Sequence, residues 1–314
     1  MRKKELFVVG ELNADLILNN IHGFPEIGTE IIADHMNLVL GSSSGIMASN
    51  AASMGTETTF CGMIGYDIFG DLVLRELKKK GVVTDFIKRT ETLNTGVTVV
   101  MSYDQDRANV THCGAMEALT FQDIPWEEVA KHKHFHLSNF FLQKGIKTDI
   151  IAIFKKAKET GVTTSLDMQW DPGNTWDFDF RSCLPYVDVF FPNEAEIKAL
   201  TGSDSITEAI TAVSPYANTI ALKLGEQGSI GFTEDQVIKV KAFINPQFID
   251  AIGAGDSFNA GFISKYISGA PLEFCLQYGN IMGALNTTAA GGTAAFQNKD
   301  QIQNRIRELF DPET

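Results

Sequence analysis

Strand-like and helix-like segments alternate along most of this sequence, and that order limits the fold more than any other feature. Short apolar runs typical of buried strands occur at residues 6–10, 58–65, 135–138, 162–166, 187–192 and 219–224. Helical spacing of apolar residues separates several of these runs, as in 67–80 and 148–160. Parallel strands need connections that cross the sheet, so we predict an α/β fold with a mostly parallel central sheet and helices on both faces.

The size and charge of the chain exclude some classes of function. Its 314 residues, 44% of them hydrophobic, suffice for one large or two small domains. The 39 acidic against 26 basic residues give a net charge of −13, which argues against a nucleic-acid partner. No apolar stretch is long enough to span a membrane. The four cysteines lie far apart without metal or redox spacing, so we expect a reducing cytoplasmic location.

Small residues precede a helix in the segment 249–261. Gly253, Ala254 and Gly255 carry almost no side chain, so another molecule can approach the backbone closely. Helical spacing of apolar residues begins directly after them. The unpaired amides and the positive dipole end of that helix predict an anion site.

Asp256 is unusual in such a site, because a carboxylate repels a phosphate. Its presence is explained if it takes the proton from a hydroxyl group that attacks phosphorus. The alternative is an acidic residue favoured by the helix dipole, next to a glycine turn.

Asn13 and Asp15 follow the first predicted strand, at the end where open α/β sheets bind ligands. Their side chains suit the adjacent hydroxyl groups of a sugar. An Asx turn at the exit of the strand is the alternative. Residues 16–40 alternate weakly, and 95–103 with 107–111 predict a hairpin. These two segments predict a small excursion outside the main sheet.

Two of these segments resemble signatures of a known family. The run Asp250-x-x-Gly-Ala-Gly-Asp-Ser-Phe-x-Ala-Gly is similar to the second signature of the ribokinase-like (pfkB) carbohydrate kinases. The segment 10–15 is similar to their N-terminus, and the resemblance covers nearly the whole chain. It implies one ribokinase-like domain over 1–314, with a β lid inserted at about 12–40 and 92–116.

The resemblance also implies an activity and its partners: phosphorylation of a hydroxyl on a small sugar or sugar-like alcohol, with ATP and Mg²⁺. It implies a homodimer formed through the lid. A monovalent cation, K⁺, is implied beside Asp250, although Ala251 stands where the family usually has threonine.

On the substrate side, the resemblance implies contacts from the loop of Gly41, Ser42 and Ser43, which opens a helix predicted to end near Ser53. Asn139, at the end of the strand 135–138, is expected beside the substrate as well.

The first family signature is altered in this chain. The family usually has a second glycine at Ser42 and, at Ile46, an asparagine that reaches the sugar. Its replacement suggests a substrate other than ribose, or contacts moved to the neighbouring serines. Asn50, one helical turn later, is a candidate substitute.

On the nucleotide side, Asn193 and Glu196 stand three residues apart at a predicted helix start, which is the spacing of a capping box. The resemblance adds a second role, in which this pair organises magnesium, water and phosphate. It also places nucleotide contacts near Lys223, Gly225 and Gly228, and adenine over Asn280.

Alternation of His132, His134 and His136 places three imidazoles on one face of a strand, which suggests a metal. Because no carboxylate or cysteine stands at ligand spacing, we favour a buried strand instead.

The chain contains no Gly-x-x-x-x-Gly-Lys-Ser/Thr motif, which excludes a Walker-type kinase. Our hypothesis is an ATP-dependent sugar kinase with Asp256 as general base. Two alternatives stay open. A nucleoside kinase needs a stacking aromatic residue such as Phe140, and a non-catalytic binding protein is supported by Ile46 but opposed by Asp256.

Overall fold

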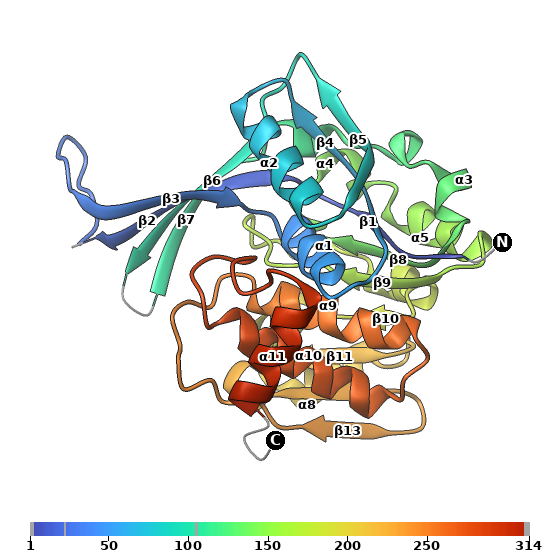
Figure 1. Ribbon diagram of the computed structural model, residues 1–314. Coiled ribbons are helices and arrows are strands. Elements are labelled where there is room, and N and C mark those ends of the chain that lie inside the picture. The colour runs from blue at the N-terminus through green and yellow to red at the C-terminus, as the bar shows by residue number, and fades with distance from the viewer. Residues whose placement is uncertain (1–2, 22, 104–105, 311–314) are drawn as a thin grey trace.

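One large sheet forms the centre of the molecule (Figure 1). The computed structural model describes residues 3–21, 23–103 and 106–310. Within these residues the sheet has nine strands, in the spatial order β13 (Val237–Val240), β12 (Ser229–Phe232), β11 (Ile220–Lys223), β10 (Val189–Phe190), β9 (Thr163–Asp167), β8 (His132–Ser138), β1 (Lys4–Val9), β4 (Thr58–Gly65) and β5 (Val83–Thr90). Neighbours pair in parallel except β11–β12 and β12–β13, which are antiparallel. The predicted mostly parallel α/β sheet is confirmed.

Helices cover both faces of the large sheet. One face carries α1 (Ser43–Ser53), α2 (Ile68–Lys79), α9 (Ala254–Ile267), α10 (Leu272–Asn286) and α11 (Lys299–Phe310). The other carries α3 (Trp126–Val129), α4 (Lys144–Lys147), α5 (Ile150–Glu159), α6 (Phe180–Cys183), α7 (Glu194–Thr201) and α8 (Ile206–Val213). Strand β1 shows the reason, because Leu6 and Val8 enter one apolar core while Phe7 and Val9 enter the other.

A second, smaller sheet projects from this layered body, to the left in Figure 1. Its spatial order is β3 (Ala33–Leu40), β2 (Asn13–Ile21), β6 (Gly96–Tyr103) and β7 (Asp106–His112). The hairpin predicted for 95–111 is therefore present, and residues 104–105 of its turn lie outside the described residues. The register aligns Asp15, Thr98 and Thr111 across neighbouring strands, so these polar residues share one face of the small sheet.

Some element boundaries differ from the prediction. Strand β10 has only two residues, because Pro192, which has no amide hydrogen, follows shortly after it. Helix α10 begins at Leu272, directly after Pro271. The edge strand β5 and the polar terminal helix α11 were not predicted, since neither has a strongly apolar run.

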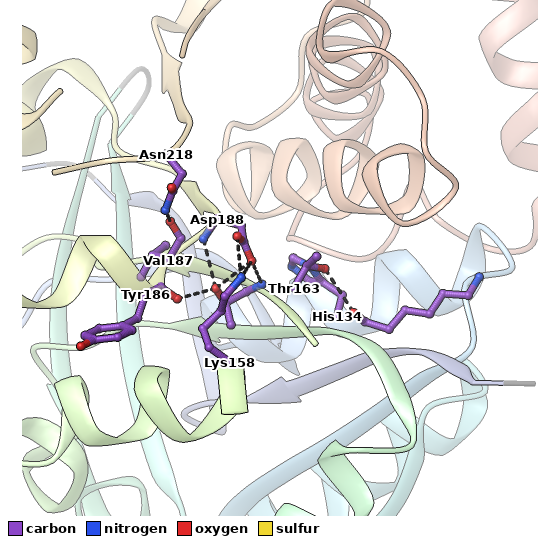
Figure 2. A network of polar contacts seen from close by, with 9 residues as sticks. His134, Lys158, Thr163, Tyr186, Val187, Asp188 and Asn218 are labelled. Atoms are coloured by element: carbon purple, nitrogen blue, oxygen red, sulfur yellow. Dashed lines mark hydrogen bonds and ion pairs between the residues drawn. The ribbon is translucent and has the colours of Figure 1, made fainter. Parts of the chain in front are cut away.

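The histidines of β8 are buried and hydrogen-bonded. His134 contacts Thr163 and Ser165 through its two ring nitrogens, both at 2.7 Å, and His136 contacts Ser165 and Ser138. Figure 2 shows His134 beside Thr163, with the ion pair of Lys158 and Asp188 nearby. Burial lowers the pKa of His136 to about 3, so its ring stays neutral. Hydroxyl groups occupy both nitrogens of both rings, as expected for a structural role.

Candidate active site

A cavity of about 230 Å³ lies between the small sheet and the start of α9. Strands β2, β6 and β7 line one side of it, and the loops after β8 and β9 line another. Seven of the residues expected to form the site lie along its wall: Asn13, Asp15, Ser42, Ser43, Asn139, Gly253 and Asp256. Segments from distant parts of the chain therefore meet at this cavity.

Glycine is required where α9 begins. Gly253 is the N-cap, with φ of +77°, and a Cβ added there would lie 2.7 Å from the Cα of Gly292. Ala254 and Gly255 then form the first turn, and the first atom that a Cβ on Gly255 would meet is the Nζ of Lys223, at 3.7 Å. First-turn amides of a helix have no partner within the helix, so this end suits an anion.

Asp256 lies in that first turn and is 8% exposed. Its Oδ1 accepts a hydrogen bond of 3.2 Å from the Nε2 of Gln169. Burial and the nearby charge of Asp167 raise the pKa of Asp256 to about 8, against the opposing effect of Lys223. A carboxyl group with this pKa can take up a proton near neutral pH.

A buried ion pair lies next to Asp256. The Nζ of Lys223 is 2.8 Å from the Oδ2 of Asp167, which also accepts hydrogen bonds from Gln169 and Asn259. Burial acts to lower the pKa of Lys223, but the carboxyl groups of Asp167 and Glu196 outweigh it, and the net shift is upward. Lys223 therefore stays positively charged beside the start of α9.

The capping box predicted at α7 is present. The Oδ1 of Asn193 accepts from the backbone amide of Glu196 at 2.8 Å, and the carboxylate of Glu196 accepts from the amide of Asn193 at 2.9 Å. Glu196 is 3% exposed, and burial followed by repulsion from Asp167 raises its pKa to about 7. Backbone pairing places Asn193 beside Lys223, so the box lies next to the ion pair.

The remaining residues expected to bind nucleotide gather near the end of β13. Gly228, with φ of +93°, leaves room for the carbonyl of Val240, which a Cβ would approach to 2.1 Å. Asn280 donates to the carbonyls of Val240 and Lys241, at 3.3 and 3.1 Å. Gly225, with φ of +56°, has open space where a Cβ would stand. Gly228 and Asn280 thus both contact the chain at residues 240–241, and the amide of Gly228 donates to the carbonyl of Gly225.

On the substrate side, the Nδ2 of Asn13 donates to Asp15 at 3.1 Å and to Thr98 at 2.7 Å. Gly41 allows this arrangement, because a Cβ there would lie 2.1 Å from the Oδ1 of Asp15. Ser42 is the N-cap of α1 and accepts from the amide of Gly45 at 2.7 Å. The loop thus presents two neighbouring serines to the cavity.

The structure shows two site residues that the sequence analysis missed, Glu11 and Gln169. Glu11 is 1% exposed, and burial raises its pKa to about 7. Gln169 bridges Asp256 and Asp167. Both follow predicted strands, the same signal that identified Asn13 and Asp15.

Backbone strain is concentrated at the cavity. Six residues other than glycine have positive φ within the described parts of the chain, and Ser42, Asn139 and Gln169 among them line the cavity. Such conformations cost about 1–3 kcal/mol each and cluster at functional sites. This distribution supports the cavity as the functional centre.

Ile46 lines the cavity and packs against Gly253 and Gly292. The suggestion that Asn50 replaces the missing asparagine is wrong. Asn50 is fully buried and donates instead to Ser257 and to the carbonyl of Gly292, both at 2.9 Å. It joins α1 to α9 and lies outside the cavity lining.

Asp250 joins two loops near the start of α9. Its Oδ2 accepts from the amide of Gly291 at 2.8 Å, and its Oδ1 accepts from the amide of Ile252. Both carboxylate oxygens of Asp250 thus have a backbone donor.

The side chains of the site suit a magnesium ion that is bound mainly by water and phosphate. No three histidine, cysteine or acidic side chains within residues 3–21, 23–103 and 106–310 are placed to hold a metal together. A magnesium ion here would therefore keep water and phosphate oxygens as its main ligands, as is usual for this ion. Glu196, a buried carboxylate near the α9 start, fits the role of a water-mediated ligand.

The chain is similar to known proteins over most of its length. The model of the pfkB family of carbohydrate kinases matches residues 3–299. An ATP-dependent ribose-1-phosphate kinase of Halopiger xanaduensis is 28% identical over 309 residues, which is 96% of this chain and 98% of that protein. Ribokinase of Arabidopsis thaliana is 26% identical over 315 residues, which is 96% of this chain and 81% of that protein.

A solved structure of Arabidopsis thaliana ribokinase with ribose and ATP shares the fold. It superposes with a TM-score of 0.82 at 24% identity and covers 97% of this chain and 99% of that chain.

Proposed function

The chain belongs to the pfkB family of carbohydrate kinases, phosphotransferases with an alcohol group as acceptor, and we propose that it transfers the γ-phosphoryl group of ATP to a hydroxyl of a small sugar or sugar-like alcohol. The observation that carries this proposal is the position of Asp256. It lies at an anion-binding helix start and faces the same cavity as Asn13 and Asp15.

We assign the acceptor side to Asn13, Asp15 and the loop 41–43, with Asn139 opposite. Carboxylate and amide groups hold adjacent hydroxyls, so one hydroxyl is placed beside Asp256. Asp256 takes the proton of that hydroxyl group. At the same time the hydroxyl oxygen forms a bond to the γ-phosphorus, and the bond between this phosphorus and the ADP oxygen breaks.

We assign charge stabilisation to the amides of Gly253 and Gly255 and to Lys223, whereas the amide of Ala254, also expected in this role, donates to the carbonyl of Ala251 at 3.2 Å. Magnesium bound through Glu196 and water would supply further positive charge at the phosphate oxygens. Gly225, Gly228, Asn193 and Asn280 border the region that we propose for the rest of ATP.

The small sheet is proposed to act as a lid on a single domain that spans residues 1–314. Its polar face, with Asp15, Thr98 and Thr111, lines the cavity. Closure over the sugar would exclude water, which otherwise competes as phosphoryl acceptor.

The opposite face of the small sheet is apolar, and we propose that a second copy of the chain covers it. Met36, Leu38 and Val110 lie on this face and are 64%, 40% and 61% exposed. Met36→Glu should convert a dimer into a monomer in sedimentation experiments, while Glu234→Gln, at an exposed loop position, should not. A wild-type chain that sediments as a monomer would rule the dimer out.

We propose that K⁺ binds beside Asp250 and supports the α9 start. Turnover in K⁺ buffer should exceed turnover in a buffer of bulky organic cations. Equal turnover in both would show that the hydrogen bonds of Asp250 suffice.

We propose the cytoplasm as the location, because Cys61, Cys113, Cys183 and Cys275 are free thiols. No helix among the described residues combines the length and the apolar character needed to cross a membrane.

The decisive experiment measures ADP release from ATP and Mg²⁺ over a panel of sugars, sugar acids and nucleosides. Asp256→Asn should lower turnover by about 10²–10⁴-fold on the true substrate. A nucleoside as sole substrate would favour the nucleoside alternative. Phe140 does not supply the stacking surface that this alternative needs, because it is 2% exposed and packs against Phe141 and Phe178. Calorimetric binding without turnover would indicate a non-catalytic protein.

A further inference from the structure

We infer that the acceptor is an uncharged polyol, and that Glu11 selects it by accepting a hydrogen bond from one of its hydroxyl groups. This inference rests on the proposed kinase function and names the substrate class of the same cavity. It depends on the charges that line the cavity, on the contacts of Glu11 and on the amide of Asn139.

The cavity wall is acidic. Glu11, Asp15 and Asp256 line it, whereas none of the lining residues that the structure describes is lysine, arginine or histidine. The nearby cation, Lys223, is paired with Asp167 at 2.8 Å and does not line the cavity. A phosphate or carboxylate on the acceptor would therefore meet three acidic groups without a basic side chain beside it, which is unfavourable at low dielectric.

Glu11 is held firmly in place. Its Oε1 accepts from the backbone amide of Ser44 at 3.3 Å and from the Nδ2 of Asn139 at 3.2 Å, and its Oε2 accepts from the hydroxyl of Ser44. The backbone amide of Glu11 adds a further contact to the carboxylate. Glu11 also lines the cavity, so its side chain borders the space that a ligand would occupy. A ligand hydroxyl in the cavity is a suitable donor.

Asn139 adds to the same acceptor surface. It has φ of +57°, and its Oδ1 is buried without a hydrogen-bond partner among the described residues. The Oδ1 of Asn13, on another wall of the cavity, is also buried without a hydrogen-bond partner among the described residues. Unsatisfied buried acceptors are rare in folded proteins and indicate a missing donor. These two acceptors thus lack donors, and a polyol supplies several.

The competing explanation is that Glu11 only fixes the start of α1 through Ser44. Two substitutions separate these roles. Glu11→Gln keeps the size of the side chain but removes its charge, whereas Ser44→Ala removes the tether and keeps the carboxylate. Both are compared with Glu234→Gln, which changes an exposed position.

The test measures kcat/KM for neutral sugars, for sugar 1-phosphates and for sugar acids, on the full chain with ATP and Mg²⁺. The wild type should prefer a neutral sugar by at least about 10-fold. Glu11→Gln should raise KM for that sugar about 10-fold, the effect of losing a hydrogen bond to a charged group, and should reduce the preference over anionic sugars. Ser44→Ala should lower the melting temperature while leaving the preference unchanged.

Two results would overturn the inference. One is a wild-type chain that phosphorylates an anionic sugar as well as any neutral one. The other is an unchanged preference in Glu11→Gln. Either would leave the kinase proposal intact, whereas absence of turnover on every acceptor would count against the kinase proposal itself.

Discussion

The side-chain amide of Gln169 donates a hydrogen bond of 3.2 Å to Asp256. The same nitrogen donates to Asp167 at 3.0 Å, so one neutral group joins two buried carboxyl groups. The backbone of Gln169 has φ of +61° and is fixed by a hydrogen bond of 3.3 Å from its amide to Asp167. This arrangement aims Asp256 at the cavity.

Gln169→Leu should lower kcat/KM at pH 7 by about 10-fold, because a hydrogen bond to a charged group is worth about 1.5–3 kcal/mol. The substitution also removes a donor that stabilises the ionised carboxyl group. The acid limb of the pH profile should therefore move to higher pH. Gln122→Leu, at an exposed position, is the control. An acid limb that does not move in Gln169→Leu would show that the Gln169 amide does not stabilise the ionised form of Asp256.

The wild-type kcat/KM should rise about tenfold per pH unit at low pH and level off near pH 8. Asp256 acts as a base only when ionised, and burial and Asp167 raise its pKa to about 8 in the free protein. Glu11 and Glu196, with pKa values raised to about 7 mainly by burial, titrate below it. Initial rates at low substrate between pH 5 and 9 test this expectation. A flat profile would contradict it.

Asp256→Asn should stabilise the fold above pH 8. The pKa of Asp256 is raised from 3.8 to about 8 in the folded state. The folded protein therefore loses stability as pH rises through this interval, because the unfolded chain ionises more easily. Asparagine removes the buried charge and keeps the shape. The melting temperature at pH 8.5 should increase by about 2 °C or more. At pH 4 the two proteins should melt at similar temperatures. An equal increase in melting temperature at both pH values would show that the buried charge of Asp256 is not the cause.

Lys223→Met should destabilise the protein by about 3–5 kcal/mol, because it leaves the carboxylate of Asp167 buried without its charge partner. Adding Asp167→Asn should recover much of this loss. Urea unfolding of the two single variants and the double variant measures the coupling. Additive effects would show that the pair does not act as a unit.

Much of the fold followed from local pattern. The predicted strands 6–10 and 58–65 correspond to β1 and β4, since buried parallel strands are nearly continuous apolar runs. The glycine turn before α9 and the capping box at α7 were also predicted, because each depends on neighbouring residues. Strand β5 was missed, because an edge strand is buried less regularly.

Local sequence patterns were enough to identify the family signature, the layered sheet and most residues of the candidate site. How these residues meet depends on contacts between distant segments. Glu11 contacts Asn139 across 128 residues, and Gln169 contacts Asp256 across 87. Such pairs depend on strand order and on packing between layers, which no local spacing encodes. The same packing shifts the pKa values of Glu11 and Asp256, since burial is set by residues from distant segments.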